Sequence, residues 1–162
     1  MADKIKMSTE ADFFSFDLTG YGVVTVDWGD GSEKLTKTLN EFGESFRHPY
    51  SNTSLRTITI NGDNITVLMC YGVLANLDVS HCTELLLLNV DGSQLTSLDM
   101  SENTALAGLN VRENGFSAAA LNALFDTLHN NTGEDKNIEI RDNPGADDCD
   151  RSIAERKGWS FL

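Results

Sequence analysis

The chain has 162 residues, enough for one mid-sized domain or two small ones, and its 40% apolar content is sufficient for a hydrophobic core. Twelve basic and 25 acidic side chains give a formal charge of −13, so nucleic acid is excluded from the expected partners. The main consequence expected of this charge is solubility. No apolar run approaches the roughly 18 residues of a membrane span, and no membrane insertion is expected.

A β-rich region is predicted over residues 8–64. The segments 13–18 (FFSFDL) and 23–28 (VVTVDW) have the apolar patterning of strands, and two glycines mark a turn between them. A further strand is predicted at 55–60 (LRTITI), where it is followed by the turn-forming sequence NGDN. About four short strands separated by turns indicate an antiparallel sheet or a small sandwich.

Three short motifs in this region resemble those of PKD-like β-sandwich domains. They are Trp28-Gly29-Asp30-Gly31, His48-Pro49-Tyr50 and the strand at 56–60 (RTITI), which correspond to the WGDG, HxY and terminal-strand pattern of that family. The resemblance covers roughly a third of the chain. It implies a spacer or adhesion module of an extracytoplasmic protein, without a catalytic role.

A 21-residue repeat runs through the middle of the chain. Residues 77–80 (LDVS) return as 98–101 (LDMS), and 88–90 (LNV) return as 109–111 (LNV). The wider pattern L-x-x-L-x-L-x-x-(N/C/S) predicts stacked coils, because residues two apart on a strand point the same way. The last position of the pattern is expected to turn the chain and to bond backbone groups of the adjacent coil. It is occupied in turn by Cys82, Ser93, Asn103 and Asn114.

The segment 94–106 (QLTSLDMSENTAL) resembles the internalin-like leucine-rich repeats of secreted and surface proteins in gut bacteria. This resemblance implies a short solenoid of about three to four coils with parallel strands. The predicted fold class is therefore α+β. It combines an antiparallel β-sandwich-like region at residues 8–64 with a leucine-rich-repeat solenoid and a C-terminal helical cap at residues 65–162.

The end of the repeats is expected to be closed by helices. Ser117 is a favourable N-cap, and it precedes one apolar helical face. That face consists of Leu121, Leu124, Phe125 and Leu128. A last repeat strand is predicted around Ile138 and Ile140, and a final helix over residues 147–157.

The sequence carries no catalytic motif of the nucleophile-elbow, P-loop, zinc-protease or dinucleotide-binding type. The three cysteines lack CxxC spacing, and Cys70 occupies an apolar repeat position, so a buried free thiol is expected there. The repeated Asp78 and Asp99 could hold a cation, but bonding to local backbone amides is their expected role. No enzyme activity, cofactor or metal site is predicted.

The candidate ligand-binding positions point outward from the main parallel sheet of the repeats, the face that repeat proteins commonly use for binding. They are Met69, Tyr71, Leu87, Asn89, Asp91, Asn110, Arg112, Glu139 and Arg141. Tyr71, Leu87 and Met69 are expected to form an apolar spot with a polar rim. The alternative is that these residues pack beneath a neighbouring region.

The sequence thus predicts a non-enzymatic module that recognises a protein or glycan partner through the repeat sheet. The family resemblances favour a position at or outside the bacterial cell surface, although residues 1–6 contain no apolar signal-peptide core. The main alternative is a structural role, as a spacer or subunit of a larger surface or particle assembly. A glycan-processing enzyme with paired carboxylates is a third possibility.

Overall fold

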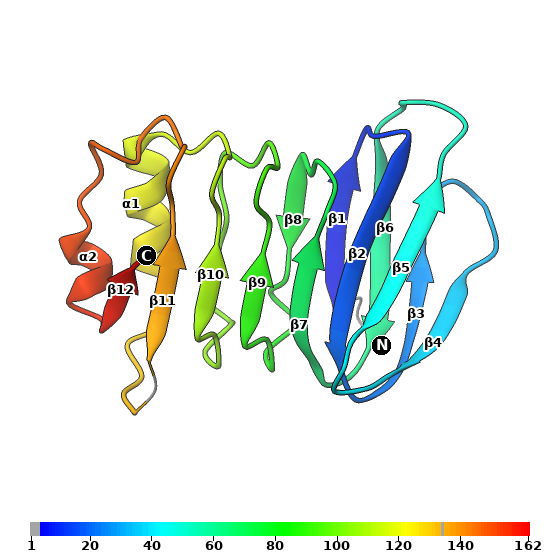
Figure 1. The fold of residues 1–162 in the computed structure, drawn as a ribbon, viewed down its shortest axis with the longest axis horizontal. Coiled ribbons are helices and arrows are strands. Elements are labelled where there is room, and N and C mark those ends of the chain that lie inside the picture. Colours follow the sequence, from blue (N-terminus) through cyan, green and yellow to red (C-terminus); the bar gives the residue numbers. More distant parts are fainter. Residues whose placement is uncertain (1–3, 134) are drawn as a thin grey trace.

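The computed structural model describes residues 4–133 and 135–162, and it consists mostly of β-strands (Figure 1). The strands are β1 (Ile5–Thr9), β2 (Phe13–Gly20), β3 (Gly22–Asp27), β4 (Leu35–Leu39), β5 (Glu44–Pro49), β6 (Arg56–Gly62), β7 (Ile65–Cys70), β8 (Asn76–Asp78), β9 (Leu87–Asn89), β10 (Gly108–Asn110), β11 (Lys136–Glu139) and β12 (Trp159–Phe161). The helices within this part of the chain are α1 (Ala118–Thr127) and α2 (Ser152–Glu155).

The strands form two sheets. The antiparallel sheet has five strands in the order β4-β3-β6-β1-β8, and the mixed sheet has seven in the order β12-β11-β10-β9-β7-β2-β5. In the mixed sheet, β2 is antiparallel to both β5 and β7, whereas the strands from β7 to β12 run parallel to one another. Figure 1 shows the mixed sheet running the length of the molecule, with the antiparallel sheet behind one half of it.

The two sheets pack face to face because their strands alternate buried and exposed residues. Phe14 and Phe16 of β2 are fully buried, as are Ile58 and Ile60 of β6. The rings of Phe16 and Phe46 stack with their centroids 5.1 Å apart. The leucines of the repeats continue this core, so a single cluster of buried side chains extends from β1 to β12.

The α+β fold class predicted from the sequence is wrong. The molecule is not a leucine-rich-repeat solenoid with a helical cap joined to a β-sandwich-like region, but a mostly β fold with one antiparallel and one mixed sheet. The reason is that β7 pairs with β2, with Leu68 opposite Leu18, while β8 pairs with β1, with Leu77 opposite Met7. The repeat strands therefore extend both sheets of the N-terminal half, and helix in the described part of the chain is limited to ten residues in α1 and four in α2.

Buried amide side chains hold the turns between successive repeat strands. The Nδ2 of Asn114 donates to the carbonyl oxygens of Val90, at 2.9 Å, and Val111, at 3.1 Å. Asn103 and Asn143 bond backbone carbonyls of the preceding segments in the same way. The role expected of this position is confirmed, because each amide donates to backbone carbonyls of the adjacent coil.

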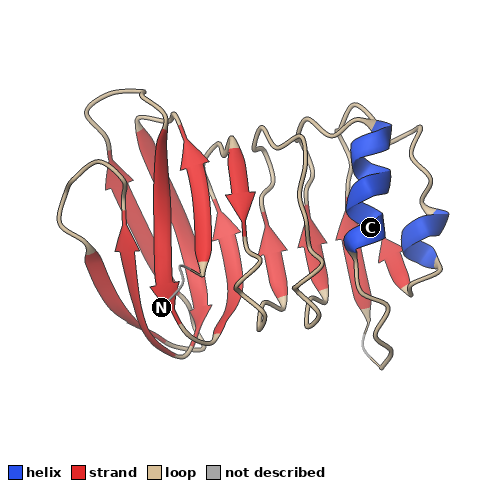
Figure 2. Cartoon of the chain, turned by 180° about the vertical axis from the view of Figure 1, so that it is seen from behind, coloured by secondary structure: helices blue, strands red, loops and turns tan. Residues whose placement is uncertain are grey.

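The helix expected after Ser117 is confirmed. The Oγ of Ser117 accepts a hydrogen bond from the backbone N–H of Ala120, and Leu121, Leu124 and Phe125 are buried on one face of α1. Figure 2, seen from behind, shows α1 in front of the last parallel strands. The helix predicted over residues 147–157 is reduced to α2. Among the described residues, no helix is long and apolar enough to cross a membrane.

The WGDG and HxY motifs together build one aromatic cluster. The ring of His48 stacks on Trp28 with their centroids 4.7 Å apart, and its Nε2 lies 2.7 Å from Oδ2 of Asp30. Tyr50 donates a hydrogen bond of 2.9 Å to the carbonyl oxygen of Trp28, and the guanidinium of Arg56 lies 3.9 Å from the Tyr50 ring centroid. His48 thus packs and bonds at the end of β5, and the cluster ties the turn after β3 to β5 and β6.

Candidate binding face

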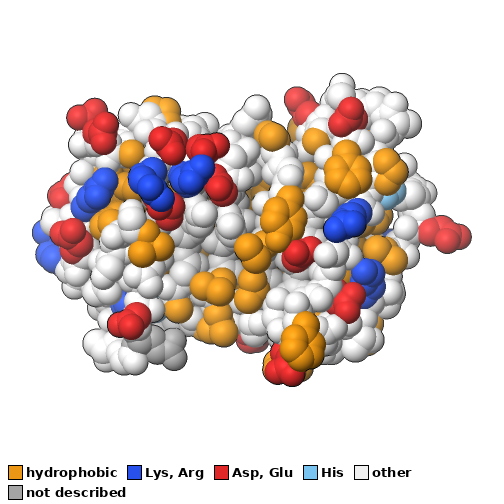
Figure 3. Space-filling view, viewed as in Figure 1, with side chains coloured by type: hydrophobic (Ala, Val, Ile, Leu, Met, Phe, Trp, Pro, Cys, Tyr) orange, Lys and Arg blue, Asp and Glu red, His pale blue; other side chains and the backbone are white. Residues whose placement is uncertain are grey.

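The face of the mixed sheet that is turned away from the core is called the outer face below. Side chains alternate across each strand, so Leu68 on β7, Leu88 on β9 and Leu109 on β10 are buried while their neighbours point outward. Because the parallel strands pair in register, the outward residues form rows that cross the strands. Figure 3 looks onto this face and shows apolar side chains gathered over its middle, with charged side chains to either side.

Two rows of outward residues cross the parallel strands, and a third follows the strand ends. The first row is Val67, Leu87, Gly108 and Asn137. The second row is Met69, Asn89, Asn110 and Glu139. The third row comprises Tyr71, Asp91, Arg112 and Arg141. The positions singled out in the sequence are Leu87 and the members of the second and third rows, and their role in ligand binding stays a prediction.

A hollow of about 510 Å³ lies over the first two rows, between β7 and β11. Its apolar lining includes Val67, Met69, Leu87 and Leu162. A Cβ at Gly108 would lie 2.3 Å from Cδ2 of Leu87, so the glycine lets the Leu87 side chain lie across the neighbouring strand. Leu87 is still 48% exposed, and the hollow therefore presents an apolar wall to solvent.

Tyr71 stands beside this hollow and is 58% exposed. Its hydroxyl donates a hydrogen bond of 2.9 Å to Oδ2 of Asp17 on β2, and lies 4.0 Å from Sδ of Met69. Partial burial and the bond to Asp17 raise the pKa of Tyr71. Tyr71 lines a second depression together with Asn89 and Asp91. The apolar spot expected from the sequence is thus divided between two adjoining depressions.

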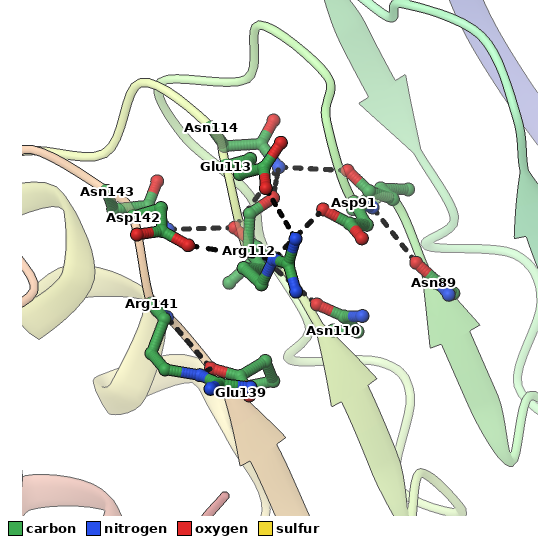
Figure 4. A network of polar contacts seen from close by, with 12 residues as sticks. Asn89, Asp91, Asn110, Arg112, Glu113, Asn114, Glu139, Arg141, Asp142 and Asn143 are labelled. Carbon is green, nitrogen blue, oxygen red and sulfur yellow. Dashed lines mark hydrogen bonds and ion pairs between the residues drawn. The ribbon is translucent and has the colours of Figure 1, made fainter.

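Asn89 and Asn110 occupy matching positions on neighbouring strands. The Oδ1 of Asn89 accepts from the backbone N–H of Asp91, and the Oδ1 of Asn110 accepts from that of Arg112, both at 3.0 Å (Figure 4). These bonds fix which way each amide is turned. Neither Nδ2 group has a hydrogen-bond partner within residues 4–133 and 135–162, so both remain available as donors on neighbouring strands.

Arg112 lies among three carboxylates (Figure 4). Its Nη2 donates to Oε1 of Glu113, and its Nε lies 3.7 Å from a carboxylate oxygen of Asp91 and 3.7 Å from one of Asp142. The hydrogen bond to Glu113, with the charge of Asp91, raises the pKa of Arg112. The positive charge of Arg112 is therefore balanced within the chain.

Glu139 is engaged by Arg141. Arg141 Nε lies 2.9 Å from both carboxylate oxygens of Glu139, and Nη2 lies 2.6 Å from Oε2. Glu139 is only 6% exposed, and the hydrogen bond from Arg141 lowers its pKa. A carboxylate held in this way is stabilised as an anion and is poorly placed to exchange a proton with a ligand.

The two repeated aspartates bond local backbone amides, as expected. Oδ1 of Asp78 accepts from the N–H of Ser80 at 2.9 Å, and Oδ1 of Asp99 accepts from that of Ser101 at 2.8 Å. Cys70 is a buried free thiol, which is also as expected, and its burial raises its pKa to about 12. The described part of the chain contains no group of three or more His, Cys, Asp or Glu side chains suited to a metal ion.

The sequence did not single out Val67, Gly108, Asn137 or Asp135, which all line the hollow. Gly108 carries a usable signal, because a glycine at an outward strand position often marks a place where another group approaches the backbone closely. Val67 and Asn137 belong to the same row as Leu87, and they could have been found by extending that row in both directions.

No protein-family model matches this chain, and its comparison with curated proteins and with solved structures gives no significant match.

Proposed function

We propose that this chain is a non-enzymatic recognition module that binds a protein or glycan partner through the outer face of the mixed sheet. The observation that carries the proposal is the exposed apolar hollow in which Leu87 lies across Gly108, between Val67 and the polar side chains of β11. Open apolar hollows with a polar rim are typical of binding sites.

The polar groups around the hollow support binding rather than catalysis. Glu139 is held by Arg141, and Arg112 is balanced by neighbouring carboxylates. General acid–base chemistry needs a group that can gain or lose a proton near the operating pH. These paired side chains are better suited to shaping the rim of a binding surface.

The family resemblances support a position at the cell surface. The WGDG and HxY motifs resemble those of PKD-like domains of extracytoplasmic proteins, and the segment 94–106 resembles internalin-like repeats of secreted and surface proteins. A recognition module would have access to partners there.

The proposal is tested with Tyr71→Ala and Leu87→Ala. The immobilised protein is screened against a glycan array and a random-peptide display library, and each variant is measured against the ligands that the wild type captures. We expect capture to weaken at least about tenfold, since exposed apolar side chains at the centre of an interface dominate affinity. The melting temperature is expected to stay unchanged, because both side chains are half exposed.

Phe42→Ala is the matched control. Phe42 is an apolar side chain that is 90% exposed and does not line the hollow, so its removal should leave capture intact. A fall in melting temperature for Leu87→Ala and Tyr71→Ala, with capture unaffected, would contradict the proposal. That result would favour the alternative structural role.

A further inference from the structure

We infer that the hollow of the outer face takes an extended segment of a partner protein in which an apolar side chain is flanked by lysine or arginine. The inference rests on the proposed function and names the class of ligand. It combines the apolar lining of the hollow, the charge around it and a pair of unused amide donors.

The apolar lining of the hollow can accommodate the apolar side chain of the ligand. Val67, Met69, Leu87 and Leu162 surround a volume of about 510 Å³, which exceeds that of any single side chain. Because Gly108 has no side chain, Leu87 lies across β10 and adds its half-exposed methyl groups to the apolar surface of the hollow. Removing such apolar surface from water favours binding.

The charge around the hollow favours basic flanks. Its lining includes Asp135 and Glu139, of which Glu139 is already paired with Arg141, and no lysine or arginine lines it within the described residues. Between residues 65 and 130 the single Lys or Arg in the sequence is Arg112, which three carboxylates already balance. Arg47 on β5 also belongs to the outer face, but it is separated from β7 by the whole of β2.

The amide donors suit the backbone of an extended segment. Asn89 and Asn110 each use Oδ1 for a backbone N–H of their own chain, and their Nδ2 groups are unused within the described residues. Both line the hollow. Carbonyl oxygens of an extended peptide are the acceptors that such donors bind when a peptide is recognised through its main chain.

The same charge disfavours a second copy of this chain as the occupant. Two molecules that each carry a formal charge of −13 repel one another, and the two outer faces would bring Asp135 and its neighbours together. A basic partner, in contrast, is attracted by this negative charge during association.

The inference is tested by selecting a random-peptide display library on the immobilised full chain, with Leu87→Asp as counter-selection. The selection is run in about 20 mM NaCl, where charges are weakly screened, and then in about 300 mM NaCl, where they are strongly screened. Gly108→Val is a second blocking variant. Each variant is checked for an unchanged melting temperature.

We expect the enriched peptides to carry an apolar residue flanked by Lys or Arg, and to lose binding to both variants. Enriched peptides that depend on Leu87 but lack basic residues would overturn the inference and leave the proposed function standing. If no peptide depends on Leu87, the inference is overturned. The proposed function would still stand if the protein then captured a glycan in a Leu87-dependent way.

One charge substitution isolates the electrostatic contribution to peptide binding. Asp135→Asn should weaken binding of a selected basic peptide by about two- to fivefold at low salt, with a smaller effect at high salt. Glu102→Gln is the matched control, because it removes one exposed charge that does not line the hollow. Equal effects of the two substitutions would contradict the assignment of Asp135 to the site.

Discussion

Asp30 joins the WGDG turn to the neighbouring strand. Its carboxylate accepts hydrogen bonds from the backbone N–H of Ser32 at 3.0 Å and from the Ser32 hydroxyl at 2.6 Å, and it lies 2.7 Å from Nε2 of His48. The bonds from Ser32 and His48 hold the pKa of Asp30 well below its ordinary value of 3.8. The ionised carboxylate therefore stabilises the fold.

This network gives a pH-dependent prediction. A lowered pKa means that the stabilisation is fully present well above the ordinary value of 3.8 and is lost progressively as the pH falls towards the value in the folded state. Asp30→Asn should lower the melting temperature by about 2–4 °C at pH 7, and this gap should narrow progressively as the pH falls from about 5 to about 2. Asp12→Asn, at an exposed position outside the cluster, is the control. A gap that stays constant over that range would argue against the network.

Among single residues, the sequence predicts which side chains point outward but not which of them pair. Glu139 and Arg141 are two residues apart and both were candidate ligand contacts, yet the arginine folds back onto the carboxylate. Arg112 likewise forms ion pairs with Asp91 and Asp142, which lie on neighbouring segments. These contacts depend on the register of adjacent strands, which a linear pattern does not contain.

At the scale of elements, α1 is positioned by a turn that packs against its first residues. The N–H of Gly145 donates to the carbonyl oxygen of Phe116 at 2.9 Å. A Cβ at Gly145 would lie 1.9 Å from the backbone nitrogen of Ala118 and 2.2 Å from the carbonyl carbon of Ser117. Backbone atoms cannot rotate away as a side chain can, so this approach requires glycine.

Alanine at two different glycines should change the stability of the protein by very different amounts. Gly145→Ala is expected to destabilise the protein by about 2–3 kcal/mol, because the turn and α1 must separate. Gly108→Ala should change stability by less than about 0.5 kcal/mol, since its Cβ would meet only the exposed end of Leu87. Chemical denaturation of both variants provides the test, and equal losses would contradict these packing arguments.

In the N-terminal half, three strands with regular apolar patterns were predicted, whereas β1 and β4 were not. The strands at 13–18, 23–28 and 55–60 correspond to β2, β3 and β6. In β4 the middle one of three inward positions is Lys37, whose Nζ extends to the carbonyl oxygen of Ser45 at 2.6 Å. A lysine at that place interrupts the alternation by which a strand is recognised.

At the scale of the whole molecule, the pairing of distant strands decides the fold. Repeat strand β7 pairs with β2 and repeat strand β8 with β1, so the repeats complete two existing sheets. Local periodicity predicted the coils but could not show which strands of the N-terminal half they would join. The α+β solenoid prediction failed for this reason.

This topology enlarges the candidate binding surface. Four parallel strands would give a face about 15 Å across, whereas the seven strands of the mixed sheet give about 29 Å at the usual spacing of about 4.8 Å. The hollow between β7 and β11 lies within that face. A segment that crosses the strands would therefore have room for contacts on both sides of its apolar residue.

The most direct test of the proposed binding function is the affinity of Gly108→Val for a ligand captured by the wild-type protein. Valine favours strands, and its side chain would occupy the space that Leu87 now covers, so the hollow should be blocked while the fold is kept. We predict a loss of affinity of at least about tenfold with an unchanged melting temperature. Unchanged affinity in a stably folded Gly108→Val variant would contradict the assignment of the outer face as the binding surface.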